Sequence, residues 1–371
     1  MPDWSKSMKQ TYEYYLVDRL SWKDTKKLNV VTSCNINRDA DVETLGSASI
    51  GITDLVGECY IRCYLVTVQN GLREKHPLGT FLCQTPKSTY DGKVRDVTVD
   101  AYTPLIELKE DQPPIGYFIP KGEKVMDKAY QLVRDRVGEN RVVKTRCDTE
   151  NYSDFVADPS EKTLSYISSF IANHVYDDRI LKYKFGLDDL GRILFMPEQE
   201  TASMQPVWTY DDSNSSILYP DVTMEHDLFG IPNVVEVSYT KNGKNYYAKV
   251  CNNDPDSPLS IKNRGREILY REVDPDLAFG ATPTEKMVKE YAVRLLKDLS
   301  SPEYSISYTH GYCPVRIGDC VRLNYARAGL TDIKAKVISQ SIKCEPGCPV
   351  TEKAVFPVKL CKEVVDYETI Q

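Results

Sequence analysis

Eleven cysteines are the residues with the most specific chemistry in this sequence of 371 residues. Cys59 and Cys63 lie four residues apart in an expected strand, so their side chains point to one face but lie roughly 13 Å apart, at about 3.3 Å per residue. That separation excludes a disulfide or a shared metal ion. The segment Cys344-Glu-Pro-Gly-Cys348 spans a turn and leaves convergence of its two thiols open, but a structural zinc ion would need two more ligands. We therefore expect packed or turn thiols and no metal site.

Histidines add no clear site. Cys313 and Cys320 are close in sequence, but no His-rich segment accompanies them. None of the histidines belongs to a two-histidine zinc motif or to a pattern with an adjacent Ser or Cys nucleophile. His310 stands before a glycine in an expected turn between strands, so we predict that it lies at the surface. The four histidines are His76, His174, His226 and His310.

Neighbouring carboxylates occur in three short segments: Asp188-Asp189, Asp211-Asp212 and Asp254-Pro255-Asp256. A glycosidase needs two carboxylates held across a cleft, which neighbours in one short segment do not by themselves provide. The segments are rich in turn-forming residues, which favours loops. The glycines from Gly116 to Gly122 have the wrong spacing for a phosphate-binding loop. We predict no catalytic, cofactor-binding or metal-binding residue, no cofactor and no enzyme activity.

The composition argues against a protein that grips nucleic acid through a broad basic surface, because the formal net charge is −7. The 25 tyrosines far outnumber the 9 phenylalanines. Tyrosine suits half-buried positions, either at the rim of a core or in subunit contacts. The first six residues lack the apolar region of a signal peptide, and no apolar run is long enough to cross a bilayer. We expect synthesis in a reducing cytoplasm with free thiols.

Two stretches have the pattern of small antiparallel β domains. In residues 304–361, Val321, Leu323 and Tyr325 alternate with polar neighbours, which is the period of a strand with one buried face. We predict a meander of about four strands there, and a meander with no covering helix tends to curl toward closure. Residues 29–102 likewise contain short strand-like runs separated by turn residues, including the hairpin signal Asn70-Gly71. The sequence therefore predicts two small β barrels.

Helical periodicity separates these β regions. Apolar residues predict one amphipathic helix over residues 124–137 and a second from Leu164 to Val175, and a hairpin is expected over 182–196. A further helix is expected over about 282–300, with Thr282 as its cap and Pro283 at its first position. We predict a mainly β, α+β chain with a first barrel at 1–109, an α+β middle domain at 110–200, and a second barrel with that helical insertion at 201–371.

Several segments together resemble the baseplate hub proteins of tailed bacteriophages, including the related hubs of phage-like particles and of siphophage tail tips. The resemblance covers nearly the whole chain, in the order barrel, helical middle, barrel. Its motifs are moderately specific, since the Pro-x-x-x-Gly-Asp-x-Val strand entry also occurs in unrelated β domains. The segments that carry it are residues 31–39, 46–50, 77–82, 98–102, 193–195, 232–237 and 314–321.

The resemblance implies a structural role. Each hub subunit would carry two tube-type barrels, so a homotrimer presents six to the six-fold tail tube and meets a three-fold spike or tip. The implied partners are the tail tube protein, distal tail or baseplate proteins, the central spike or tip protein and a tape measure protein. DNA would pass through the lumen without specific binding, which an acidic pI near 5.4 fits. The implied location is the virion tail baseplate or tip, after assembly in the host bacterial cytoplasm.

Two other functions stay open at this point. A receptor- or glycan-binding tail protein is one, for which the many tyrosines are suggestive. A peptidoglycan-degrading tail enzyme is the other, and it would need a cleft with a metal ion or paired acids. Some siphophage relatives carry a hydrolase after the hub module, whereas here the sequence ends soon after the last expected strand pair. We expect any lytic activity to belong to another chain.

Overall fold

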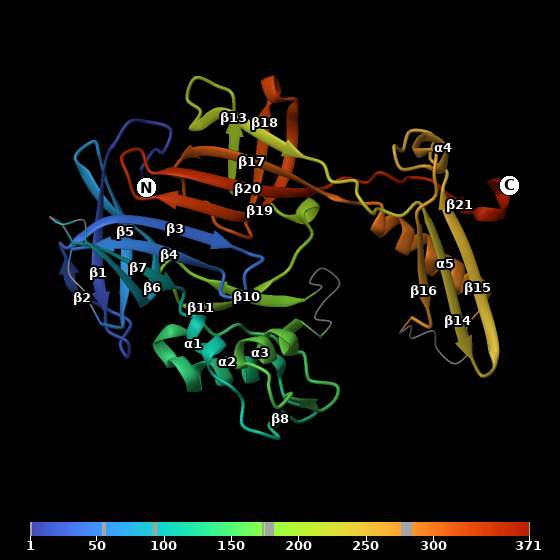
Figure 1. Cartoon of the computed structure of the whole chain (residues 1–371), viewed down its shortest axis with the longest axis horizontal. Coiled ribbons are helices and arrows are strands. Elements are labelled where there is room, and N and C mark those ends of the chain that lie inside the picture. Colours follow the sequence, from blue (N-terminus) through green and yellow to red (C-terminus); the bar gives the residue numbers. More distant parts are fainter. Residues whose placement is uncertain are drawn as a thin grey trace. The chain divides into compact units, whose positions relative to one another are not determined.

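The computed structural model describes residues 2–53, 57–90, 92, 95–172, 174, 182–275 and 284–370. Two compact units make up the chain. The large unit comprises Met1–Val222 and Ser307–Ala354, and the small unit comprises Thr223–Ile306 and Val355–Gln371. Antiparallel strands dominate and helices are few (Figure 1), which confirms the predicted mainly β, α+β class. The predicted domain boundaries stay a prediction, and those near residues 109 and 200 both fall inside the large unit.

The first strand set of the large unit is antiparallel throughout, in the order β3-β4-β7-β6-β5-β1-β2. The Asn70-Gly71 hairpin forms as predicted between β5 and β6, with both turn residues at positive φ. Side chains of β3 reach β5 and β6, which are not its neighbours, so the sheet curls on itself. The strands are β1 (Lys9–Val17), β2 (Asp24–Leu28), β3 (Val31–Asp39), β4 (Gly46–Ile52), β5 (Cys59–Gln69), β6 (Leu72–Tyr90) and β7 (Arg95–Tyr102).

The second strand set runs β13-β17-β20-β19, with β18 beside β19 and β12 beside β18. The closing region is therefore not the predicted meander, because β17 pairs with β20 instead of β18. The reason is the connection after β17, where Tyr312, Cys313 and Val315 are buried, so the chain crosses the core before β18 begins. The strands are β12 (Trp208–Asp211), β13 (Leu218–Glu225), β17 (Glu303–Gly311), β18 (Cys320–Tyr325), β19 (Leu330–Lys343) and β20 (Pro349–Pro357).

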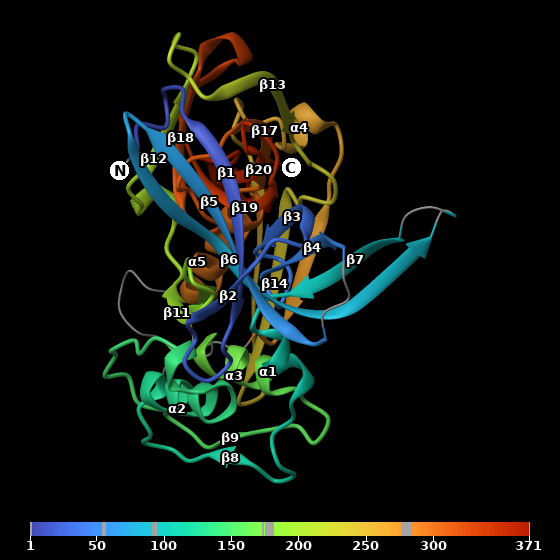
Figure 2. The same ribbon diagram turned by 90° about the vertical axis from the view of Figure 1, so that its left-hand side faces the viewer.

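Pairing between β3 and β19 joins the two strand sets into one sheet, which has 13 strands in the described part of the chain. The register runs from Asn35 opposite Lys343 to Asp39 opposite Ser339. Figure 2 shows β1, β5 and β6 of this sheet side by side, with the helices α1, α2 and α3 gathered at one side of the sheet. The large unit is thus a continuous β scaffold with a helical attachment.

The helical attachment has its own core, made by apolar faces of three helices and the hairpin β10–β11. The predicted helix at 124–137 is confirmed as α2, and its apolar face is buried. The second predicted helix is α3, although Val175 lies outside the described residues. The elements are α1 (Ile106–Glu110), β8 (Phe118–Ile119), α2 (Val125–Val137), η1 (Glu139–Arg141), β9 (Phe155–Val156), α3 (Thr163–Ala172), β10 (Tyr183–Leu187), β11 (Ile193–Pro197) and η2 (Thr201–Ser203).

The small unit is a four-stranded sheet, ordered β16-β14-β15-β21, with α5 packed on one face. α5 begins at Glu285, and its N-cap is Thr284, whose hydroxyl accepts a hydrogen bond from the Met287 amide. The predicted cap Thr282 and Pro283 lie outside the described residues. The elements are β14 (Val234–Lys241), β15 (Lys244–Asn252), α4 (Ile261–Arg264), β16 (Leu269–Val273), α5 (Glu285–Leu299), β21 (Val364–Asp366) and η4 (Tyr367–Ile370), while η3 (Ala326–Ala328) belongs to the large unit.

The start of β4 requires a glycine. Gly46 has φ +135°, and an added Cβ would fall on the Asn37 carbonyl oxygen of β3. We expect Gly46→Ala to lower the free energy of unfolding by about 1–3 kcal/mol, the usual cost of a strained backbone. Urea denaturation measures this loss. Gly57→Ala is the matched control, because no atom lies within 4 Å of its added Cβ. Equal losses in both variants would contradict the assignment of strain to Gly46.

Candidate functional site

The cysteines form no metal site in the described residues, and all eleven are free thiols. Cys63 and Cys59 have different neighbours, in line with the expected separation. The Cys63 Sγ lies 3.8 Å from that of Cys34, whereas Cys59 stands opposite Cys83 across the β5–β6 ladder. In the Cys344–Cys348 turn, the backbone N–H of Cys344 donates to the Cys34 carbonyl at 3.0 Å. Most of these thiols are buried, so they behave as packing residues.

The carboxylate pairs lie in turns or loops, as predicted, except that Asp211 is the last residue of β12. Asp188 accepts hydrogen bonds from the backbone amides of Leu190 and Arg192 and forms an ion pair with the Arg192 side chain. Asp211 caps the turn after β12 through Ser213. In the small unit, Asp254 is buried and accepts backbone hydrogen bonds that lower the pKa of its carboxyl group. The bond from the Lys362 N–H has the largest effect. These contacts describe turn carboxylates and no acid–base pair.

The prediction for His310 is wrong, because the structure buries this residue completely in β17. The Nε2 atom of His310 lies 3.2 Å from the Oε1 atom of Glu352 in β20, which is also fully buried. Burial alone would lower the pKa of His310, but hydrogen bonds to Cys313 and Glu352 raise it to about 10. Burial likewise opposes the charge of Glu352, yet the imidazolium of His310 keeps its pKa below the usual value. The two residues form a buried ion pair.

Glu352 is the centre of a buried polar network that connects four strands. Its Oε2 accepts hydrogen bonds from Tyr308 at 2.8 Å and Tyr210 at 3.2 Å. Its Oε1 accepts one from the Gln340 amide at 2.5 Å. These partners come from β17, β12 and β19. Because β12 and β20 are not neighbours in the sheet, the network shows that the second strand set also curls around a shared interior.

The arrangement of Cys313, His310 and Glu352 has the composition of a thiol–imidazole–carboxylate triad. The Cys313 Sγ lies 3.9 Å from His310 Nδ1, but that nitrogen donates to the Gly311 carbonyl at 2.6 Å. Cys313 is also buried and lines neither of the two hollows described below. A nucleophile needs both an aligned base and access to a substrate. We therefore interpret the network as a structural brace.

The brace extends across the junction of the two strand sets. Arg38 in β3 donates to Gln340 Oε1 at 2.8 Å and to the Leu78 carbonyl at 2.6 Å. Gln340 also donates to the Val315 carbonyl, so its amide is fully occupied between the two sets. Arg38 is 8% exposed, and no carboxylate of the described residues lies within ion-pair distance of it. Its charge is held by neutral oxygens.

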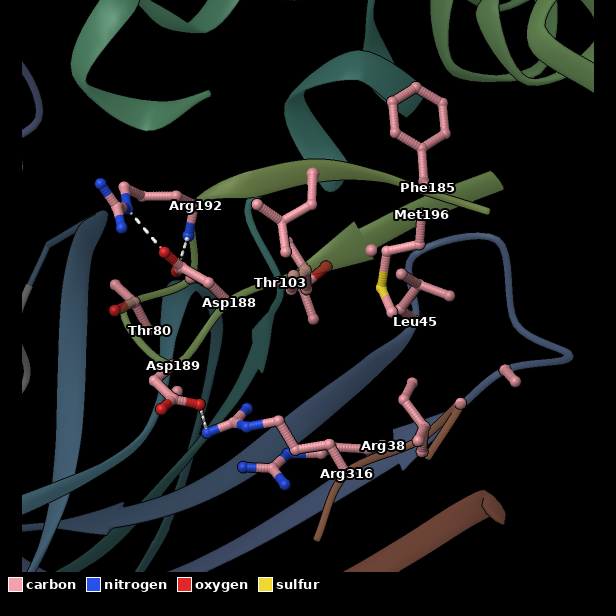
Figure 3. A pocket seen from close by; sticks show the side chains of 18 of the residues that line it. Arg38, Leu45, Thr80, Thr103, Phe185, Asp188, Asp189, Arg192, Met196 and Arg316 are labelled. Carbon is pink, nitrogen blue, oxygen red and sulfur yellow. Dashed lines mark hydrogen bonds and ion pairs between the residues drawn. The ribbon is translucent and has the colours of Figure 1, made fainter. Parts of the chain in front are cut away.

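A cavity of about 540 Å³ adjoins Arg38 on the side of the β10–β11 hairpin. We call it the hairpin cavity. Figure 3 shows Arg38, Arg316 and Asp189 together, with Leu45, Phe185 and Met196 at a separate part of the wall. A second hollow of about 400 Å³, bounded by α3 and the β3–β4 turn, shares Leu45 and Phe185 with it. Charged and apolar side chains both line the hairpin cavity, which is the larger of these two hollows.

The turn of the β10–β11 hairpin is fixed to the first strand set by one carbonyl. The Leu190 oxygen accepts hydrogen bonds from Trp22 at 2.9 Å, Thr80 at 2.8 Å and Arg62 at 3.3 Å. Arg62 is itself buried and paired with Asp24. Because three donors hold a single backbone atom, this wall of the hairpin cavity is rigid.

A second buried arginine joins the helical attachment to the first strand set. Arg141, in η1, is 1% exposed and donates to Glu107 at 2.9 Å and to the Tyr60 hydroxyl at 2.6 Å. Its guanidinium lies 4.6 Å from the ring centroid of Trp22. The pKa of Tyr60 is raised chiefly by burial. Sequence reasoning missed Arg141, because a single arginine after a helix is usually solvated.

The residues of the brace did have a signal in the sequence. Arg38, His310 and Glu352 each occupy the inward position of an alternating strand, following Ile36, Tyr308 and Val350 respectively. A charged residue at an inward position is buried unless the strand ends there. That pattern would have favoured a buried network.

No protein-family model matches the sequence, and no curated protein matches it either. Solved structures do match over nearly the full length. A tail protein from Neisseria meningitidis is 15% identical, with a TM-score of 0.62 over 93% of this chain and 96% of that one. The 43 kDa tail protein of prophage MuSo2 from Shewanella oneidensis is 11% identical, with a TM-score of 0.62 over 94% of this chain and 98% of that one.

A prophage tail protein, gp18, from Listeria monocytogenes is 11% identical, with a TM-score of 0.50 over 92% of this chain and 94% of that one. At these identities the likeness is one of fold. It extends over the strand sets, the helical attachment and the small unit, since the matched share is above nine-tenths in each case. The resemblance predicted from the sequence is thus confirmed at the level of architecture: the chain has the fold of prophage tail proteins.

Proposed function

We propose that this chain is a structural hub protein of a bacteriophage tail, acting as a homotrimer and without enzyme activity. The observation that carries the proposal is the likeness to two tail proteins, one of them from a prophage, along almost the entire length of each chain. A likeness confined to one unit would fit a shared module in an unrelated protein, whereas this one includes both units and the connections between their elements. The described residues also contain no helix with the length and apolarity needed to span a membrane.

Two features of the chain support a hub: the arrangement of strands in its large unit and its net charge. Two curled sets of mainly antiparallel strands are joined in one chain through the pairing of β3 with β19. Three such chains would present six sets to a six-fold tail tube and a three-fold end to a spike or tip. The formal net charge of −7 suits a conduit through which DNA slides without adhering. The tail tube protein, distal tail or baseplate proteins, the spike or tip protein and a tape measure protein are the expected partners.

The oligomeric state is the sharpest test. At 42.2 kDa per chain, we expect light scattering after size exclusion to give about 127 kDa, and electron microscopy to show a ring with an axial hole. The measurement is repeated over a range of protein concentrations, because a trimer held by weak contacts dissociates on dilution. A chain that stays monomeric at every concentration and also binds host glycan, or digests peptidoglycan in a gel, would refute the hub.

A further inference from the structure

The hairpin cavity has a wall of uncommon chemistry. Its polar side carries two guanidinium groups, those of Arg38 and Arg316, and its other walls are mostly apolar. Its volume of about 540 Å³ falls in the range of small-molecule sites, which run from roughly 300 to 1,000 Å³. Such sites combine apolar walls with a few convergent polar groups that fix the orientation of a ligand.

The two guanidinium groups have one ion-pair partner between them in the described residues, Asp189, while the carboxylates of Glu352 and Asp319 act on Arg38 from beyond ion-pair distance. Arg38 is bonded to a glutamine side chain and a carbonyl. Arg316 forms an ion pair with Asp189, whose side chain is 54% exposed and therefore shares its charge with solvent. Burial, and next the charge of Arg38, lower the pKa of Arg316 to about 9. An anionic group placed between these two cations would relieve their repulsion.

The other charged groups on the wall have partners of their own, although the charges of Asp319 and Asp188 also act on Arg316. Arg192 and Asp188 neutralise each other within the hairpin turn. Asp319 accepts the backbone N–H of Arg316 at 2.8 Å. Lys184, at the border with the second hollow, lies 4.0 Å from Glu198, and burial followed by its lysine neighbours lowers its pKa to about 8. The excess on the wall is therefore positive.

The apolar part of the wall would accept a hydrocarbon or aromatic group. Leu45, Phe185 and Met196 line it, on a different side from Arg38 and Arg316 (Figure 3). Burial of apolar ligand surface against these side chains adds to the binding affinity in proportion to the area removed from water, and it needs no directional bonds. We propose that the hairpin cavity binds a small amphiphile, with an anionic carboxylate or phosphate head between Arg38 and Arg316 and an apolar body against Leu45, Phe185 and Met196.

The test uses the full chain and three probes of equal tail length: octanoate, octyl phosphate and octanol. Isothermal titration calorimetry should show octanoate or octyl phosphate binding at least ten-fold more tightly than octanol, because one charge-assisted bond is worth about ten-fold or more. The preferred head distinguishes a carboxylate ligand from a phosphate ligand. Octanol binding as tightly as both anions, or no heat from either anion at millimolar concentration, would overturn the proposal.

Three variants connect the binding to this wall. Arg316→Gln should weaken the binding of the anionic probe by about ten-fold or more, since it removes one charged partner. Asp189→Asn should tighten the binding of the anionic probe by about two- to five-fold, because the substitution releases Arg316 from an exposed ion pair. Arg322→Gln is the matched control, for it breaks a surface pair with Asp332 outside the cavity.

The gain expected from Asp189→Asn cannot come from misfolding, so the proposal stays testable if Arg316→Gln is unstable. Unchanged affinity in both Arg316→Gln and Asp189→Asn, or a loss in Arg322→Gln as large as that in Arg316→Gln, would contradict it. The outcome is independent of the trimer measurement, because the whole cavity lies within one chain.

Discussion

Replacing Glu352 by Gln should lower the free energy of unfolding by about 3–5 kcal/mol, the usual cost of removing one partner from a buried ion pair. The carboxylate is fully buried and accepts from Tyr308, Tyr210 and Gln340 while it balances the charge of His310. An amide can accept at only one of its two positions and would direct its N–H groups toward donors. Urea denaturation followed by circular dichroism measures the loss.

The loss should also depend on pH in a defined direction. Because the pKa of His310 is raised from 6.5 to about 10, its contribution to stability is complete below pH 6.5 and is lost as the pH rises through 10. The pKa of Glu352 is lowered from 4.5, so its contribution is present above pH 4.5 and is lost at more acidic pH. The difference between wild type and Glu352→Gln should be largest between about pH 4.5 and 6.5 and shrink toward pH 10.

Glu345→Gln is the control for this prediction. Glu345 lies in the exposed turn between β19 and β20, and its backbone carbonyl, not its carboxylate, accepts the hydrogen bond from Tyr12. Its substitution should change stability by less than about 0.5 kcal/mol. A loss in Glu352→Gln that is constant from pH 5 to pH 10 would mean that His310 is uncharged in the folded protein.

Replacing Arg141 by Met should also lower the free energy of unfolding by about 3–5 kcal/mol. The substitution leaves Glu107 with its ion pair to Arg19 but removes the bond to Tyr60 and the stacking on Trp22. Since these contacts join the helical attachment to the first strand set, we expect the attachment to lose protection from amide hydrogen exchange before the strands do.

A double-mutant cycle separates the ion pair from packing. Arg141→Met combined with Glu107→Met should lose less stability than the sum of the single variants, because the double variant also removes the buried guanidinium that Glu107→Met alone leaves without its carboxylate. Arg134→Met, which removes an exposed arginine paired only with its neighbour Asp135, should have little effect. Strict additivity of the two single losses would show that Arg141 and Glu107 do not act as a pair.

Local patterns were sufficient to predict most elements of this fold. Asn70-Gly71 forms the expected hairpin, because this dipeptide adopts positive φ at low cost, and Asn242-Gly243 joins β14 to β15 in the same way. The helix Val125–Val137 follows from the spacing of its apolar residues. In each case the information lies within about a dozen neighbouring residues. The strand alternation also predicted which side chains of β18 would be buried.

Pairing between distant strands was decided by the tertiary structure. The predicted meander failed because the chain after β17 carries Tyr312, Cys313 and Val315 into the core and places β17 beside β20. A turn signal such as Gly311 shows that the chain changes direction. It does not show which strand it will meet, since strand neighbours are selected by packing over the whole interior.

The candidate site depended on the same long-range packing. Arg38 meets Gln340, which is 302 positions away in the sequence, and the hairpin cavity draws its walls from five separate segments, within residues 38–45, 78–81, 103, 184–196 and 316–319. The sequence by itself determined the periodicity, the turns and the inward positions of the charged residues, because these are properties of neighbouring residues. The tertiary structure alone decided which inward polar groups meet, because that depends on which distant strands pair: β17 with β20 brings His310 to Glu352, and β3 with β19 brings Arg38 to Gln340.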